Sequence, residues 1–146
     1  MELVSTDIKE TEAVAKELVS SLEPKPDGAL VVGLYGNLGS GKTTFTQFFA
    51  EALGVIERLV SPTFVILKKY PIQNGRGFKT FVHIDAYRLD DSNELKALRF
   101  AEEVGNPENL IFIEWADKIE DALPEDAMKI YFEYLDDKTR KISYNK

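Results

Sequence analysis

The residues best suited to chemistry form one continuous segment near position 40. It reads Gly36-Asn37-Leu38-Gly39-Ser40-Gly41-Lys42-Thr43, a complete G-x-x-x-x-G-K-T phosphate-binding loop. Its glycines let backbone N–H groups approach an anion, and the helix that follows adds its positive dipole end. Lys42 supplies a charge for the terminal phosphates, and the Thr43 hydroxyl supplies a ligand for Mg²⁺. The segment therefore predicts a site for a nucleoside triphosphate with magnesium.

Such a site also needs an acidic side chain that holds Mg²⁺ or orients the attacking water. Two carboxylates stand at the ends of apolar runs: Asp85 follows 81–84, and Glu114 follows 110–113. In α/β sheets, ligands bind at the carboxyl ends of the strands. A single carboxylate there is usually a helix cap or a solvated loop residue, but two beside an intact phosphate loop favour catalysis. The residues leave open which of the two contacts the metal directly.

A sheet and helices must position these side chains. The apolar run 29–34 before the loop predicts a buried strand. After the loop, Phe45, Phe48, Phe49 and Ala52 recur at helical spacing and predict a helix over 44–53 that Gly54 ends. Upstream, an amphipathic helix is predicted over 8–22, capped within 5–7, with a buried face formed by Ile8, Thr11, Ala15, Leu18, Val19 and Leu22.

The rest of the chain adds strands joined by hairpins. Strands are predicted up to Tyr70, over 79–85 and over 110–113, and a final hairpin over 128–135 and 139–144. Short helices are predicted over 92–98 and 116–122. Because hairpins are interleaved with strand–helix units, we predict an α/β fold: one three-layer P-loop NTPase-like domain over 1–146, with a mixed β-sheet.

Composition limits the classes of function. The chain has 146 residues, 44% of them hydrophobic, and its net charge is −7, whereas a free-standing nucleic-acid binder normally presents a basic face. The absence of cysteine excludes disulfides and thiolate metal sites. The first residues lack the features of a signal peptide, and no apolar run is long enough to span a bilayer. We therefore expect a cytoplasmic protein with no membrane partner.

His83 and Trp115 are the only histidine and the only tryptophan of the chain. One histidine cannot build a metal site, so we interpret His83 as a half-buried strand residue. Trp115 directly follows Glu114. It could belong to the core, seal the site or face a partner, and spacing does not separate these three interpretations.

Four motifs resemble, in order and spacing, those of the TsaE family, also called YjeE. They are the phosphate loop extended to Thr44, S-P-T-F at 61–64, H-I-D-A-Y-R-L at 83–89 and I-E-W at 113–115. Very many proteins share the phosphate loop, but the other three motifs are far more specific. The resemblance covers nearly the whole chain.

The resemblance implies a small bacterial P-loop ATPase required to make threonylcarbamoyladenosine in tRNA. It implies action with the TsaD–TsaB heterodimer and contact with tRNA only indirectly, through that complex. It further implies catalytic roles for Lys42, Asp85 and Glu114, and Mg²⁺ ligation by Thr43 with Glu114 and Asp85. The implied contacts to ATP or ADP are Thr11, Gly36, Asn37, Leu38, Gly39, Ser40, Gly41, Lys42, Thr43, Thr44, Ser61 and Thr63. Asn37 replaces an acidic residue common in the family, at a position that binds no phosphate.

Two other functions stay open at this point. A small nucleoside or metabolite kinase shares the loop and the size, but such kinases usually carry an arginine-rich lid. The stretch that directly follows Asp85 has only Arg88 and Arg99, and no basic lid is visible there. A non-catalytic module that senses nucleotide and reports it to a partner is the other alternative. Because no arginine except Arg88 is a candidate to act at the phosphates, we expect slow hydrolysis by the isolated chain.

Overall fold

The structure is a computed structural model, and it describes residues 2–36, 41–59, 67–73, 77–87, 89 and 99–144. Within these residues lie seven strands, three α-helices and one 3₁₀ helix. In chain order they are β1 (Glu2–Ser5), α1 (Ile8–Ser21), β2 (Leu30–Tyr35), α2 (Lys42–Leu53), β3 (Leu67–Pro71), β4 (Thr80–Asp85), α4 (Phe100–Val104), β5 (Asn109–Glu114), η1 (Ala116–Ala122), β6 (Met128–Tyr134) and β7 (Arg140–Tyr144).

The described strands form one mixed sheet in the order β1-β7-β6-β2-β5-β4-β3. The strand before the phosphate loop, β2, lies at the centre and pairs in parallel with both β5 and β6. On the β5 side, β4 pairs in parallel with β5, and β3 returns antiparallel to β4. On the other side, β1, β7 and β6 pair antiparallel. The mixed sheet predicted from the interleaved hairpins is confirmed.

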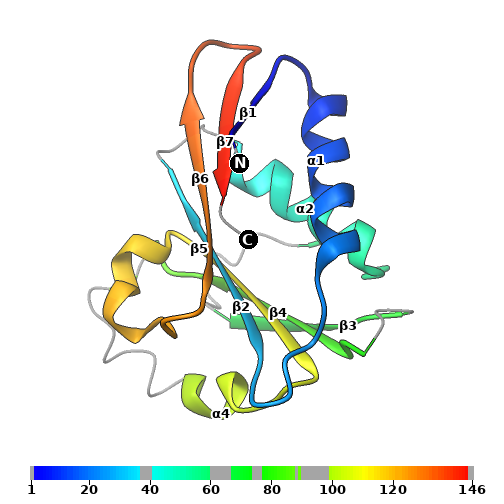
Figure 1. The fold of residues 1–146 in the computed structure, drawn as a ribbon, viewed down its shortest axis with the longest axis vertical. Coiled ribbons are helices and arrows are strands. Elements are labelled where there is room, and N and C mark those ends of the chain that lie inside the picture. The colour runs from blue at the N-terminus through cyan, green and yellow to red at the C-terminus, as the bar shows by residue number, and fades with distance from the viewer. Residues whose placement is uncertain are drawn as a thin grey trace.

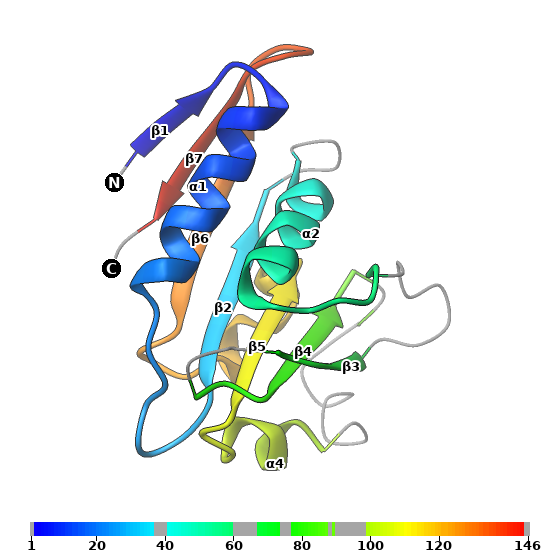
Figure 2. The ribbon, with the colours of Figure 1, turned by 90° about the vertical axis from the view of Figure 1, so that its right-hand side faces the viewer.

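Helices cover both faces of this sheet. Figure 1 shows α1 and α2 on one side and η1 on the other, and Figure 2 shows α1 and α2 side by side over the strands. Separate apolar clusters fill the two spaces. Phe45 and Phe49 of α2 pack with Phe81 and Phe112 under the helical pair, while Val82 and its neighbours pack under α4 and η1. These clusters anchor the strands whose ends form the candidate site.

Local sequence explains the two long helices. Asp7 caps α1, because its side chain accepts a hydrogen bond from the Glu10 N–H at 2.9 Å, and the Glu10 carboxylate in turn accepts one from the Thr6 N–H at 3.1 Å. The second helix, α2, ends at Gly54, which adopts a left-handed φ of 111°. A Cβ at Gly54 would lie 1.9 Å from the carbonyl oxygen of Gln73, so this close approach requires glycine.

Alternation along the strands aims several polar groups at the α1/α2 face. On β4, Phe81 joins the cluster on that face, whereas Val82 and Ile84 join the opposite cluster. With a period of two, His83 and Asp85 point the same way as Phe81. On β5, Phe112 and Glu114 share that face by the same reasoning.

Some elements differ from the predicted ones. Neither β1 nor α4 was predicted; β1 is a short edge strand held by β7, and α4 is a five-residue helix. Ile8 was predicted on the buried face of α1 but is 61% exposed, at the first position of the helix. The predicted helix over 92–98 and the S-P-T-F segment lie outside the described residues. Among the described helices, none has the length and apolar character to cross a membrane.

Candidate nucleotide-binding site

The phosphate loop has the predicted strand–loop–helix context. Strand β2 ends at Tyr35, and α2 begins at Lys42. Between them Gly36 and Gly41 have positive φ values of 148° and 98°, which favour glycine. Gly41 is the N-cap of α2 and has no side chain, so among the described residues no N-cap side chain occupies the first N–H groups of the helix. Asn37, Leu38, Gly39 and Ser40 lie outside the described residues.

Lys42 is held between the loop and an aromatic ring. Its ammonium donates to the Gly36 carbonyl and lies 3.8 Å from the centroid of the Trp115 ring. Burial lowers the pKa of Lys42 below its ordinary value, and nearby carboxylates, Glu114 foremost, oppose this shift. The lysine therefore carries its charge in a partly desolvated place, where electrostatic attraction to an anion is strong.

Trp115 reaches this position through an unusual backbone. Its φ of 58° is left-handed, which is uncommon for a residue other than glycine and marks the turn from β5 into η1. Its ring also packs against that of Tyr87, with 5.1 Å between the centroids. The ring packs against the apolar cluster under α4 and η1 and also contacts the site residue Lys42, so the geometry supports a place at the edge of the core that borders the site.

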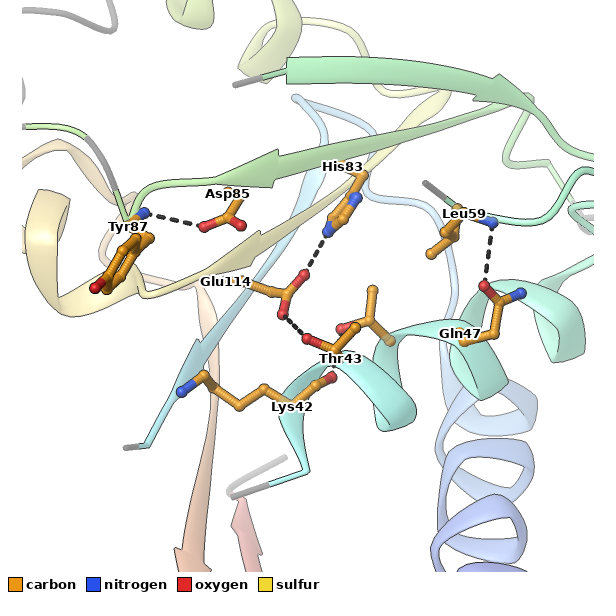
Figure 3. A network of polar contacts seen from close by, with 9 residues as sticks. Lys42, Thr43, Gln47, Leu59, His83, Asp85, Tyr87 and Glu114 are labelled. Carbon is orange, nitrogen blue, oxygen red and sulfur yellow. Dashed lines mark hydrogen bonds and ion pairs between the residues drawn. The ribbon is translucent and has the colours of Figure 1, made fainter. Parts of the chain in front are cut away.

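Glu114 joins two elements at the centre of the site. It is 4% exposed, and its Oε1 accepts a hydrogen bond from the Thr43 hydroxyl at 3.1 Å. Its Oε2 lies 2.6 Å from Nε2 of His83. Figure 3 shows the carboxylate between the start of α2 and strand β4. The structure thus brings together Thr43 and Glu114, two of the three residues expected on the metal side.

Asp85 is the second strand-end carboxylate and lies next to Glu114. The two residues are paired in the parallel register of β4 and β5. Oδ1 of Asp85 accepts a hydrogen bond from the Tyr87 N–H at 3.0 Å. Burial raises the pKa of Asp85, the Tyr87 hydrogen bond lowers it, and the Glu114 charge raises it further. Two carboxylates with different partners can take different roles, one beside the metal and one beside a water.

A cavity of about 510 Å³ adjoins the start of α2 on the side of the β6–β7 hairpin. Thr11, Gly41 and Thr44 line it, and so does Arg140, whose side chain lies beside Gly41. The Thr11 hydroxyl is buried and shares a hydrogen bond of 2.7 Å with the Ser5 hydroxyl. The structure therefore groups Thr11 with the loop, although 30 residues separate them in the chain.

A second cavity, of about 330 Å³, opens on the metal side. Thr43, His83 and Glu114 line it together with Leu59, whose N–H donates to the Gln47 side chain at 3.1 Å. Ser61, Thr63 and Arg88 lie outside the described residues, so their expected roles stay predictions.

The sequence did not reveal the role of three residues at the site. His83 was interpreted as half-buried, but it is 3% exposed and contacts Glu114. Its spacing of two from Asp85 on one strand was the available signal, because such residues share a face. Arg140 gave no signal, since a hairpin brings it to Gly41 from a distant part of the chain. Trp115 was recognised as a candidate, but its contact with Lys42 depends on a backbone turn that composition does not reveal.

Comparison with known proteins places this geometry in a family. The family model described as "Threonylcarbamoyl adenosine biosynthesis protein TsaE" matches residues 5–142. The chain is 36% identical to the tRNA threonylcarbamoyladenosine biosynthesis protein TsaE of Bacillus subtilis, over 93% of this chain and 79% of that protein. It is 32% identical to the protein of the same name from Aquifex aeolicus, over 97% of this chain and 96% of the relative.

A solved structure agrees with these sequence matches. The crystal structure of YdiB from Bacillus subtilis superposes with a TM-score of 0.76 at 33% identity, covering 99% of this chain and 83% of that one. Family model, relatives and fold thus point the same way as the phosphate loop and the strand-end carboxylates. The chain belongs to the TsaE family, whose members take part in the biosynthesis of threonylcarbamoyladenosine in tRNA.

Proposed function

We propose that this chain binds ATP with Mg²⁺ and hydrolyses ATP to ADP and phosphate. The observation that carries the proposal is the meeting of Thr43 and Glu114 beside Lys42, at the N-terminus of α2. An uncapped helix start attracts phosphate, and a hydroxyl beside a carboxylate offers Mg²⁺ the oxygen ligands it prefers. The order strand, glycine-rich loop and helix is the context in which this motif binds the phosphates of a nucleotide.

The residues present fit magnesium better than a metal held in a protein cage. In the described part of the chain, no group of three or more His, Asp or Glu side chains could hold an ion. Mg²⁺ commonly takes one or two protein oxygens and completes its shell with water and substrate phosphates. Thr43 and Glu114 would hold it here. When bound, the ion neutralises negative charge on the terminal phosphates.

The larger cavity supports binding of the nucleoside part. It has room beside Gly41 for a group attached to the phosphates, and Thr11 and Thr44 offer hydroxyls to it. Charged side chains of both signs also line it: Lys138 and Arg140 with Asp7 and Asp137. These contacts favour a nucleotide over a bare phosphate anion.

Hydrolysis needs a positioned water, and Asp85 is the candidate to orient it. Its half-buried carboxylate has a raised pKa, so it is more basic than a fully exposed aspartate. The oxygen of the water bonds to the γ-phosphorus, and the bond from that phosphorus to the β–γ bridging oxygen breaks. ADP, inorganic phosphate and one proton leave. Lys42 stabilises the charge that develops on the phosphates.

We further propose that this hydrolysis serves tRNA modification together with a TsaD–TsaB heterodimer. Membership in the TsaE family supports the pathway. The net charge of −7 favours contact with tRNA through the complex rather than by this chain alone. Of the described arginines near the site, Arg58 lines the metal-side cavity, and Arg140 lies beside Gly41, where it donates to the carbonyls of Asp136 and Thr139. We propose that the partner adds a further charge that accelerates the reaction.

The test measures phosphate release by the chain with and without TsaD–TsaB, for wild type and Glu114→Ala. We expect slow release alone, a rise with the partner, and loss of both in the variant. Fast release by the isolated chain would contradict partner activation. Binding and assembly without any turnover would favour a regulatory module, and phosphoryl transfer to a nucleoside would favour a kinase.

A further inference from the structure

His83 is a buried polar residue whose ring lies among aromatic side chains on one side and borders the metal-side cavity on the other. It is 3% exposed, and its ring centroid lies 6.3 Å from that of Phe81 on the same face of β4. Across the sheet it is paired in register with Phe112. Burying an imidazole among aromatic rings is unfavourable unless its nitrogens are hydrogen-bonded. For packing alone, an apolar ring such as that of phenylalanine would be more favourable at this position.

The hydrogen bonds of the ring point to a specific use. Nε2 lies 2.6 Å from Oε2 of Glu114, whereas Nδ1 has no hydrogen-bond partner among the described residues. A carboxylate oxygen accepts, so the contact with Glu114 requires a proton on Nε2, which donates to Oε2.

Because of its contact with His83, the two carboxylate oxygens of Glu114 have different partners. Oε2 accepts from His83, and Oε1 faces the Thr43 hydroxyl at 3.1 Å. Figure 3 shows the two contacts on opposite sides of Glu114, from β4 and from α2. A carboxylate with one oxygen held in this way cannot rotate freely, so the other oxygen keeps its direction.

We propose that His83 is a positioning residue for Glu114 that fixes which carboxylate oxygen is presented beside Thr43 to the magnesium ion. The proposal rests on the proposed function, since it assigns a role within that site. Hydrogen-bond partners of metal ligands orient the ligand, and their loss typically costs roughly 10- to 100-fold in metal affinity. His83 would act through Glu114 and touch neither metal nor nucleotide.

The test compares His83→Phe with His83→Gln. Phenylalanine keeps a ring among Phe81 and Phe112 but removes both nitrogens. Glutamine places an N–H donor the same number of bonds from Cβ as Nε2 of histidine. Calorimetric titration of ADP, with Mg²⁺ and with a chelator, gives the magnesium-dependent part of the affinity, and thermal unfolding reports folding.

We expect His83→Phe to weaken the magnesium-dependent part of the ADP affinity roughly 10-fold or more, with the magnesium-free affinity unchanged. His83→Gln should recover most of the loss. Wild-type magnesium dependence in His83→Phe would overturn the proposal. So would equal losses of affinity with and without Mg²⁺ in both variants, because that pattern indicates a purely structural role. If wild-type protein bound ADP without any magnesium dependence, the proposed function would fail, and the role of His83 with it.

Discussion

Two replacements of Glu114, by glutamine and by alanine, distinguish the effect of its charge from the effect of its hydrogen bonds. Glutamine can accept from His83 through its carbonyl and donate to the Thr43 hydroxyl through its amide, so both contacts survive without the negative charge. Alanine removes both contacts and leaves the Nε2 proton of His83 without its acceptor. The two variants therefore predict different stabilities but the same loss of magnesium binding.

The magnitude follows from the burial of the site. Hydrogen bonds to a charged group contribute about 1.5–3 kcal/mol each, and Glu114 makes two while only 4% exposed. The alanine variant no longer buries a negative charge beside Asp85, and this gain offsets part of the stability lost with the two hydrogen bonds. We expect Glu114→Ala to lower the free energy of unfolding by roughly 2–4 kcal/mol. For a chain of this size that is a fall in Tm of roughly 5–15 °C.

Thermal unfolding without nucleotide measures the stability of the two variants. Titration with ADP, with and without Mg²⁺, measures how far the ADP affinity depends on magnesium. Glu114→Gln should stay within about 1 kcal/mol of wild type, and its ADP affinity should no longer depend on magnesium. Equal stability of the alanine and glutamine variants would refute the assigned hydrogen bonds. Wild-type magnesium dependence in Glu114→Gln would refute the metal-side role of the charge.

Three other predictions concern Asp85, Trp115 and Phe49. Burial raises the folded-state pKa of Asp85, so the stability it contributes is present below its unfolded pKa and is lost as pH rises through the folded pKa. Asp85→Asn should therefore raise Tm at pH 7, with an advantage that vanishes under acid conditions, while phosphate release falls roughly 100-fold or more. ADP should draw Lys42 from the Trp115 ring and change the emission of this only tryptophan, and Lys42→Met should alter the emission without ADP and abolish the response. Phe49→Ala, which empties a fully buried position 4.5 Å from the ring of Phe112, should cost about 3–5 kcal/mol in urea unfolding.

Much of the fold follows from local patterns. The apolar runs around 30–35 and 109–114 are strands because both sheet faces are covered, and Gly54 ends α2 because only glycine fits there. The edge strand β1 was not predictable in this way. Its four residues gain their structure from pairing with β7, which lies at the other end of the chain.

In the candidate site too, some residues could be predicted from local sequence and others depend on contacts between distant segments. Lys42, Thr43, Asp85 and Glu114 stand out because their residue types and neighbours match a chemical requirement. His83 does not, because its role depends on the register between β4 and β5, and register is a property of two strands. Arg140 likewise reaches Gly41 only through the tertiary fold.

The parallel pairing of β4 with β5 also affects how well the connection before β4 tolerates insertions. Asp85 lies at one end of β4, whereas the connection from Pro71 to Thr80 enters at the other. Backbone hydrogen bonds along the strand hold the carboxylates opposite each other whatever the length of that connection. Insertions there, whether in evolution or as an engineered peptide tag, should leave the spacing of Asp85 and Glu114 intact.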